Sequence, residues 1–304
     1  MYDVIIVGAG PAGLAASVYA ARKRLNALLI SENIGGQVNR TSGVENYLGY
    51  QFIEGAELIS KFESQVSQYT LDQQIGVVVS GVTKTEGGFR VGTRDGANYE
   101  GRTVIYASGK RPRELGVPGE SEFAGRGVSY CAICDGPLFA GRRVAVVGGG
   151  NSALEAALDM VKIAEHVDLV ARNGFTCDEV LVDKLKQTRN TSIYLGYRTD
   201  SIQGSQFVEG MDISEPEGGT KVNLPVSGVF VEIGLVPNSE PLRALLQLNE
   251  LGEIPVNCSC ETSVPGLFAA GDVSDVPEKQ IIIAAGEGAK AMLQAHRYLR
   301  RLTV

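Results

Sequence analysis

The 304-residue sequence predicts an α/β protein of two three-layer, Rossmann-like domains, the second inserted into the first. Two glycine-rich turns carry this prediction, GAGPAG at residues 8–13 and GGGNSA at residues 148–153. Each turn follows a short apolar run and precedes a segment with helical spacing, which is the order of a βαβ unit. The length also agrees better with two domains than with one. We expect one discontinuous domain from residues 1–115 and 239–304, and another from residues 116–238.

The first unit is expected to hold a nucleotide. Its predicted strand, helix and second strand lie at residues 2–7, 11–23 and 27–30. Gly8, Gly10 and Gly13 would let the backbone approach a pyrophosphate, and the helix N-terminus would supply N–H donors. Glu32 lies 19 positions after Gly13, near where a ribose-binding acidic side chain is expected.

The remaining elements follow in order along the chain. After an amphipathic helix at residues 56–69, we expect strands at residues 76–82, 89–93, 99–101 and 103–107. The second unit has a predicted strand, helix and strand at residues 143–147, 153–164 and 167–170, and a segment at 228–234 closes it. A last strand near 267–272 and a long helix at 280–301 return to the first domain, which is therefore discontinuous.

Cys131 and Cys134 stand two residues apart in CAICDG, between the two glycine turns. Such a pair can close a small disulfide ring and open it again. The thiolate is the attacking species and a free thiol has a pKa of about 8.5, so a proton carrier is needed. Asp135 is the candidate, because neither His166 nor His296 lies in a motif.

The five cysteines also permit a metal site as an interpretation. Cys258 and Cys260 could join Cys131 and Cys134 as a Cys₄ zinc site, although Cys-x-Cys is a tight spacing for zinc. Cys177, Cys258 and Cys260 agree better with ordinary small hydrophobic side chains, so we expect no metal.

The composition excludes several classes of partner. The net charge is −7 and there is no long basic run, which argues against nucleic acid and anionic membrane surfaces. No apolar stretch approaches the roughly 20 residues that span a bilayer. The N-terminus has no basic segment or cleavage site of a signal peptide. An odd number of cysteines without a secreted pattern agrees with a reducing cytoplasm.

Taken together, these motifs resemble the low-molecular-weight thioredoxin reductase family, close to the branch of the alkyl hydroperoxide reductase flavoprotein. The resemblance covers residues 2–302 and is carried by GAGPAG, GGQ, VENY, CAICDGPLF, VGGGNSA, FAAGD and KQIIIAAGEGAKA. The chain starts directly at the first strand, so we expect neither the N-terminal thioredoxin-like domain of that flavoprotein nor the C-terminal dimer domain of larger disulfide reductases.

The resemblance implies FAD on the first turn and NADH or NADPH on the second. The residues that it assigns to FAD are Gly8, Gly10, Gly13, Glu32, Gly36, Gln37, Asn46, Gly271, Asp272, Gln280 and Ile281. Glu32 is the softer assignment, because Ser31 could take its place. The residues for the nicotinamide nucleotide are Gly148, Gly150, Asn151, Ser152 and Arg172.

The activity implied is that of an FAD-dependent NAD(P)H:protein-disulfide reductase. Electrons would pass from the nucleotide through FAD to the Cys131–Cys134 disulfide, and then to thioredoxin or a thioredoxin- or glutaredoxin-like protein. The family also implies that Cys134 faces the flavin, that Cys131 attacks the partner and that the protein is a homodimer. It further implies a rotation of the nucleotide domain, for which residues 113–120 and 236–240 are the predicted hinges.

The nucleotide preference follows from the residues after the strand at 167–170. NADPH enzymes of this family carry a dense basic cluster there, but this chain has only Arg172, preceded by Ala171. We therefore expect use of NADH, or of both nucleotides.

Three rival activities share these motifs: a small-molecule dithiol oxidase, a ferredoxin-dependent thioredoxin reductase and a flavin-bearing redox sensor. The intact second glycine turn argues against the first two, and retention of both cysteines and both turns argues against the third.

Overall fold

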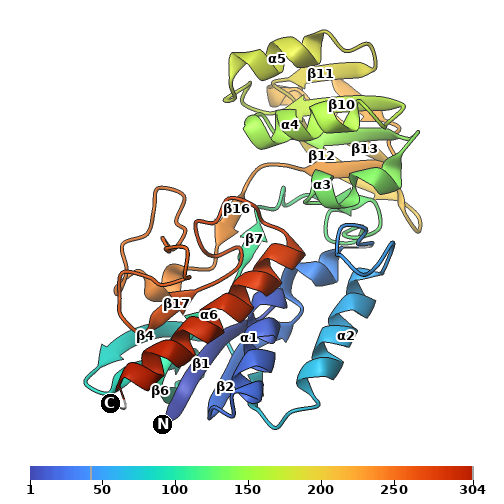
Figure 1. The fold of residues 1–304 in the computed structure, drawn as a ribbon. Helices are drawn as coiled ribbons and strands as arrows, with labels where there is room; N and C mark the ends of the chain where they lie inside the picture. Colours follow the sequence, from blue (N-terminus) through green and yellow to red (C-terminus); the bar gives the residue numbers. More distant parts are fainter. Residues whose placement is uncertain (42, 303–304) are drawn as a thin grey trace.

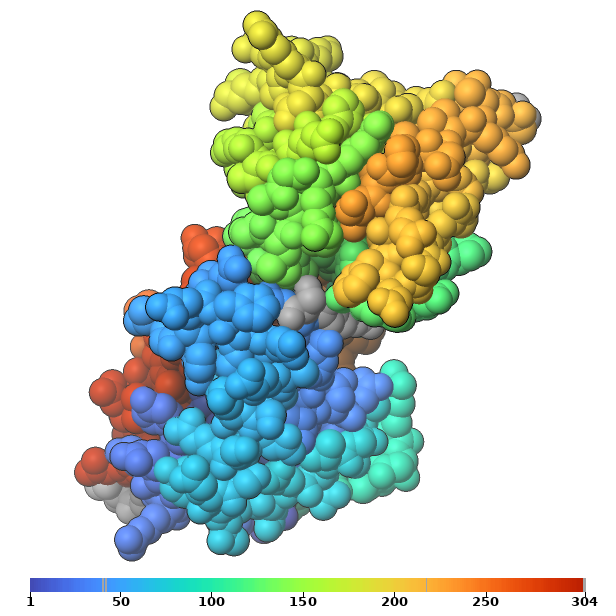
Figure 2. All heavy atoms as spheres, turned by 90° about the vertical axis from the view of Figure 1, so that its right-hand side faces the viewer, coloured from blue at the N-terminus to red at the C-terminus, as the bar shows by residue number. Residues whose placement is uncertain are grey.

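The computed structural model describes residues 1–41 and 43–302, which form two lobes (Figure 1). The terminal lobe contains both chain ends, and the inserted lobe contains the elements from β8 to β15. In the space-filling view of Figure 2, the green part of the inserted lobe rests against the blue part of the terminal lobe. The two lobes therefore meet along an interface as well as through the connecting chain.

The terminal lobe is built on a seven-stranded sheet with the order β3-β2-β1-β6-β5-β4, and β17 pairs with the end of β6. β1, β2, β3, β6 and β17 pair in parallel, whereas β4 and β5 are antiparallel. The strand bounds are β1 Tyr2–Ala9, β2 Ala27–Ile34, β3 Asp72–Ile75, β4 Val79–Thr85, β5 Gly88–Thr93, β6 Asn98–Tyr106 and β17 Leu267–Ala269.

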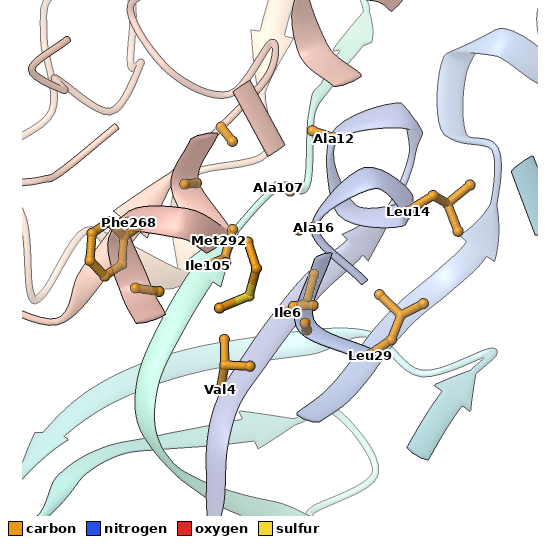
Figure 3. Packing of buried hydrophobic residues seen from close by; sticks show 14 of the residues in the cluster. Val4, Ile6, Ala12, Leu14, Ala16, Leu29, Ile105, Ala107, Phe268 and Met292 are labelled. Carbon is orange, nitrogen blue, oxygen red and sulfur yellow. The ribbon is translucent and has the colours of Figure 1, made fainter. Parts of the chain in front are cut away.

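Alternation along β1 explains the layers of this lobe. Successive side chains point to opposite faces of a strand. Ile6 joins the core under the helices α1, α2 and α6, while Ile5 joins the core on the opposite face. Figure 3 shows Met292 of α6 reaching toward Ile6 and Ile105. The helix bounds are α1 Pro11–Arg22, α2 Gly55–Val66 and α6 Ile281–Leu302.

The inserted lobe repeats this architecture on a smaller scale. Its five-stranded parallel sheet has the order β11-β10-β9-β15-β8, and a three-stranded antiparallel sheet, β12-β13-β14, covers the face opposite to α4 and α5. The bounds are β8 Val128–Ser129, β9 Arg143–Val147, α4 Asn151–Met160, β10 His166–Ala171, α5 Glu179–Lys186, β11 Thr191–Leu195, β12 Arg198–Gly204, β13 Val208–Ser214, β14 Lys221–Leu224 and β15 Gly228–Val231. The predicted fold class is confirmed: two three-layer, Rossmann-like domains, with the second inserted in the first.

Two short strands connect the lobes. β7 (Lys110–Pro112) leads into the inserted lobe, β16 (Leu235–Pro237) leads out, and the two pair antiparallel. Asn238 fastens them: its N–H donates to the Gly109 carbonyl and its Nδ2 to the Ser108 carbonyl, 2.8 Å away. The predicted hinges at residues 113–120 and 236–240 follow β7 and overlap β16, but the sequence did not predict this ladder.

Several predicted elements differ from the structure in their bounds. The strand expected at residues 76–82 is β4, which begins at Val79 and ends at Thr85, and the helix expected at 56–69 is α2, which ends at Val66. The strands expected at residues 99–101 and 103–107 are one strand, β6, which pairs with β5 in its first half and with β17 in its second. The helix expected at 153–164 is α4, which begins at Asn151 and ends at Met160. The chain leaves the helix there because Glu165 donates its N–H to the Arg142 carbonyl, which places β10 beside β9.

Candidate functional site

A cavity of about 1870 Å³ lies between the two lobes. Its walls come from the first glycine turn, the segment after β2, the start of α6 and the cysteine pair of the inserted lobe. Small-molecule pockets are usually no larger than about 1,000 Å³, so this cavity has room for a ligand as large as a dinucleotide. The residues assigned to FAD that line it are Gly8, Gly10, Glu32, Gly36, Gln37, Asn46, Gly271, Asp272, Gln280 and Ile281.

The first glycine turn has a backbone that side chains would obstruct. Gly8 has a φ of +101°, and a Cβ on Gly13 would lie 1.7 Å from the Gly8 carbonyl oxygen. A Cβ on Gly10, in contrast, would meet nothing within 4 Å, because Gly10 borders the cavity. The α1 N-terminus follows Gly10 and receives no side-chain cap. Its N–H groups agree with the needs of a pyrophosphate.

Ser31 and Glu32, neighbours in the second half of β2, have different roles. The Ser31 hydroxyl accepts the Ala9 N–H at 2.9 Å and donates to the Asn33 carbonyl at 2.6 Å, so it holds the glycine turn. Glu32 is exposed and lines the cavity. The Ser31 hydroxyl is therefore occupied by the backbone, whereas the Glu32 carboxylate could bind a ribose.

Polar side chains from distant segments meet beside the first turn. Gln37, in the 3₁₀ helix η1 (Gly36–Arg40), donates from Nε2 to the Asp272 carboxylate at 3.3 Å. Asn46 donates to the Gln280 side chain at 3.2 Å, just before α6. Burial raises the pKa of Asp272. These donors and acceptors have the chemistry to hold a hydroxylated chain.

Glu287 supports the loop that presents Asp272. This buried carboxylate on α6 accepts the Gly271 N–H at 2.8 Å. Gly271 has a φ of +73°, so the loop needs a glycine as well as this acceptor. The sequence pattern pointed to Gly271 and Asp272 but not to Glu287.

A buried charge cluster joins the cavity to the connecting strands, and sequence reasoning missed it. Glu253 accepts from Lys110 of β7 at 2.5 Å and from Lys279 at 3.2 Å. Burial works against ionisation of Glu253, but hydrogen bonds from Lys110 and Asn249 bring the net pKa below its usual value. Both lysines line the cavity. The partners lie far apart in sequence, so no motif could have shown the cluster.

The cysteine pair faces the same cavity as the first glycine turn. Cys131 and Cys134 form a disulfide, and both border the cavity. Cys131 precedes the one-turn helix α3 (Ala132–Asp135), which continues into the 3₁₀ helix η2 (Gly136–Phe139), and its sulfur accepts the Cys134 N–H at 3.3 Å. The Ser129 hydroxyl at the end of β8 accepts the Cys131 N–H at 3.1 Å. The disulfide is thus held by the parallel sheet.

Asp135 follows Cys134 directly in sequence, and its side chain is buried. The Ser129 hydroxyl donates to Asp135 Oδ2 at 2.6 Å, while Oδ1 has no hydrogen-bond partner among the residues that the structure describes. Burial raises the pKa of Asp135 to about 6, although the Ser129 hydrogen bond works in the opposite direction. A carboxyl with this pKa exchanges its proton near neutral pH, which is what a dithiol–disulfide site needs.

Glu232 is a second carboxyl at the dithiol. It follows β15 directly, lines the cavity and accepts the Ala132 N–H at Oε1, 3.2 Å away. No motif marked it, since it lies 100 residues from Ala132 in sequence.

The second glycine turn lies outside most of this cavity. Of the residues assigned to the nicotinamide nucleotide, Ser152 lines the cavity, whereas the others are not part of its described lining: Gly148, Gly150, Asn151 and Arg172. Asn151 is exposed and exchanges hydrogen bonds with Asp178 before α5, at 2.9 and 3.2 Å. Arg172 is exposed just after β10.

The other cysteines do not gather around a metal. Cys260 is buried in the core of the terminal lobe, Cys258 is exposed, and Cys177 packs against the core of the inserted lobe. Among residues 1–41 and 43–302, no three histidine, cysteine or acidic side chains are placed to share a metal ion. In the same part of the chain, no helix has the length and apolar character that a membrane crossing requires.

The arrangement is that of a nucleotide-dependent disulfide oxidoreductase. The chain belongs to the pyridine nucleotide-disulphide oxidoreductase family, whose profile matches residues 2–288. This family implies FAD and a pyridine nucleotide. The open backbone at Gly10, the uncapped α1 N-terminus and the polar groups around Asp272 fit the flavin nucleotide.

Particular relatives agree with this assignment. A component of the alkyl hydroperoxide reductase of Staphylococcus aureus (strain MSSA476) is 42% identical over 301 residues, which are 99% of this chain and 59% of that protein. The chain thus spans about three fifths of that relative. Thioredoxin reductase from Streptococcus pyogenes MGAS5005 superposes with a TM-score of 0.94 at 36% identity, covering 99% of both chains. Lactococcus lactis thioredoxin reductase in its FR conformation has a TM-score of 0.68 at 31% identity, covering 99% of this chain and 100% of that one.

Proposed function

We propose that the chain is an FAD-dependent NAD(P)H:protein-disulfide reductase of the thioredoxin-disulfide reductase type, whose partner is thioredoxin or a thioredoxin- or glutaredoxin-like protein. The observation that carries the proposal is that the Cys131–Cys134 disulfide and the first glycine turn line the same cavity. Electrons delivered to a flavin in that cavity would then have a protein disulfide in the same cavity as their acceptor. FAD, when bound, supplies the means of passing the two electrons of a hydride to a disulfide.

The residues around the disulfide manage its protons. Opening the S–S bond with two electrons requires up to two protons, and the Asp135 carboxyl, with its raised pKa, holds one of them. When the Cys131 thiol gives up its proton to become the thiolate that attacks a partner disulfide, the Asp135 carboxylate can take up that proton. Ser129 holds both groups, since its hydroxyl donates to Asp135 and accepts from the Cys131 N–H.

We further propose that the inserted lobe rotates about β7 and β16. In this arrangement the disulfide faces the cavity, while most of the second glycine turn does not, so one orientation cannot serve both electron donor and acceptor. Two solved relatives support the proposal: at nearly equal coverage and similar identity, their TM-scores are 0.94 and 0.68. A cross-link between the lobes should permit a single turnover and block further ones. Unimpaired multiple turnover would contradict the rotation.

The donor is proposed to be NADH, or both NADH and NADPH, because Arg172 is the one basic residue in the stretch that follows β10, residues 172–176. A hundredfold preference for NADPH would contradict this. A homodimer, a cytoplasmic location and the domain bounds at residues 115/116 and 238/239 complete the proposal.

The experiment that tests the function is anaerobic stopped-flow reduction of the flavin-loaded protein by NADH and by NADPH, followed by coupling to thioredoxins. We expect flavin reduction in the wild type and in C134S, but partner reduction in the wild type alone. Absence of flavin reduction by either nucleotide would contradict the proposed function.

A further inference from the structure

Glu232 lies where the second glycine turn and the dithiol segment meet. Its N–H donates to the Val147 carbonyl at 2.8 Å, which continues the pairing of β15 with β9. Its own carbonyl oxygen lies 2.3 Å from the Cβ position built on Gly148. The backbone of Glu232 is therefore fixed against the second glycine turn.

The side chain of Glu232 reaches to the dithiol. Its Oε1 accepts the Ala132 N–H at 3.2 Å, and Ala132 is the residue next to Cys131. Glu232, Cys131 and Cys134 all line the cavity between the lobes. The carboxyl thus holds the first residue of α3 by a hydrogen bond from the sheet side. Asp135 is the last residue of this one-turn helix.

Burial, rather than a partner of opposite charge, dominates the surroundings of the Glu232 carboxyl. Burial raises the pKa of Glu232 to about 7, and the Ala132 N–H is the one opposing influence on it. The charged groups of the inserted lobe that line the same cavity are Asp135 of α3, Glu155 and Asp159 of α4, Lys162 after α4 and Lys184 of α5. Among the described residues, none of these charged groups forms an ion pair or a hydrogen bond with Glu232, so the carboxylate has little local compensation.

We propose that Glu232 is a positioning residue whose carboxylate charge, held against the Ala132 amide, shifts the Cys131–Cys134 pair toward the disulfide. Reduction breaks the S–S bond with two electrons and yields two thiols, or a thiol and a thiolate with one proton fewer. A neighbouring negative charge disfavours the thiolate. The charge of Glu232 therefore works against the reduced pair, and protonation of Glu232 removes that effect. The inference rests on the proposed function, because it requires a redox-active pair.

The test compares wild type, E232Q and the matched control E155Q, each loaded with flavin. Glu155 is an exposed carboxylate that lines the same cavity from α4. Each protein is equilibrated anaerobically in glutathione buffers at pH 8.5 and pH 5.5, from the oxidised and the reduced side. Two glutathione molecules supply the two electrons and two protons and become glutathione disulfide. Alkylation and mass spectrometry then give the ratio of dithiol to disulfide.

We expect E232Q to raise this ratio about tenfold at pH 8.5, which is 29.6 mV for a two-electron couple, and to leave it unchanged at pH 5.5, where Glu232 is protonated. E155Q should match the wild type at both values. E232A also loses the acceptor for the Ala132 N–H. Compared with E232Q, it should change the ratio of dithiol to disulfide by the same factor at both pH values.

Two outcomes would overturn the inference while leaving the proposed function intact: an E232Q ratio equal to that of the wild type at pH 8.5, or an equal shift at both pH values, which a purely structural contact would give. A wild-type pair that glutathione does not interconvert at all would instead overturn the proposed function, and this inference with it.

Discussion

The two glycine turns share a sequence pattern but differ in their surroundings. The first has glycine at its last position, since a Cβ on Gly13 would lie 1.7 Å from the Gly8 carbonyl oxygen. The second has Ala153 there, whose methyl group is fully buried. The first turn opens into the large cavity between the lobes, whereas the second is held by the exposed Asn151–Asp178 pair.

We propose that this difference separates a resident nucleotide at the first turn from an exchangeable one at the second. A ligand in the cavity contacts segments from both ends of the chain, including Gln37 and Asp272. A ligand on the second turn meets a surface near Arg172 that is largely open to solvent. Affinity depends on how fully a ligand is buried and how well its polar groups are matched. We therefore expect flavin to stay bound through turnover, and the pyridine nucleotide to come and go.

The largest expected effect is at the close approach in the first turn. Gly13→Ala should reduce the flavin-to-protein ratio to less than a tenth of the wild-type value, because the new methyl group has no room beside Gly8. The matched change in the second turn, Ala153→Gly, should leave flavin content unchanged. Absorbance of the purified proteins measures both. Full flavin content in Gly13→Ala would show that the turns are more alike than we describe.

The next effect is at the dithiol. Asp135→Asn should lower kcat/KM for a partner disulfide about a hundredfold, the usual contribution of a positioned acid–base group. Because burial raises the pKa of Asp135 to about 6, the carboxylate that takes up the thiol proton accumulates as pH rises through that value. Wild-type kcat/KM should therefore rise through pH 6, and that of the variant should not. An unchanged inflection in Asp135→Asn would assign it to another group.

A smaller effect is expected at the support of the second turn. Asp178→Ala removes the carboxylate that accepts from the Asn151 side chain, and should raise KM for NADH about tenfold with kcat little changed. Flavin content should stay at the wild-type level, since Asp178 lies outside the described lining of the cavity. Steady-state kinetics and flavin absorbance check the two parts. Loss of flavin would show that the turns are coupled.

The smallest effect concerns the choice of nucleotide. Arg172→Ala should raise KM for NADPH about fivefold, because one exposed charge-assisted hydrogen bond to a phosphate is lost. KM for NADH should stay within twofold. Parallel titrations with the two nucleotides measure this. An equal loss for both would mean that Arg172 serves the shared part of the nucleotide.

The features that the sequence could predict are those written in short segments. The glycine turns, the cysteine pair and Asp135 each lie within six consecutive residues, and periodicity placed the strand Arg143–Val147 at its observed bounds. Stereochemistry at such places is local, so residue type and spacing are enough to indicate it.

The features that it could not predict depend on tertiary contact. Glu232 meets Ala132 across 100 residues and Lys110 meets Glu253 across 143, with no motif at either. β7 and β16 have three residues each, too few for a periodic pattern. The sequence indicated two strands at residues 99–101 and 103–107. They are one strand, β6, whose partner changes from β5 to β17 halfway along.

The ladder between β7 and β16 has a consequence for how such chains diversify. Pro112 and Leu235 face each other on adjacent strands, so the insert enters and leaves through points about 5 Å apart. A two-residue hairpin turn could close that gap, so residues 113–234 could be exchanged as one cassette without altering the β7–β16 pair. The cassette carries the dithiol and the second glycine turn together. A lineage could thus acquire a new electron donor and a new protein partner in one genetic event and keep its flavin site.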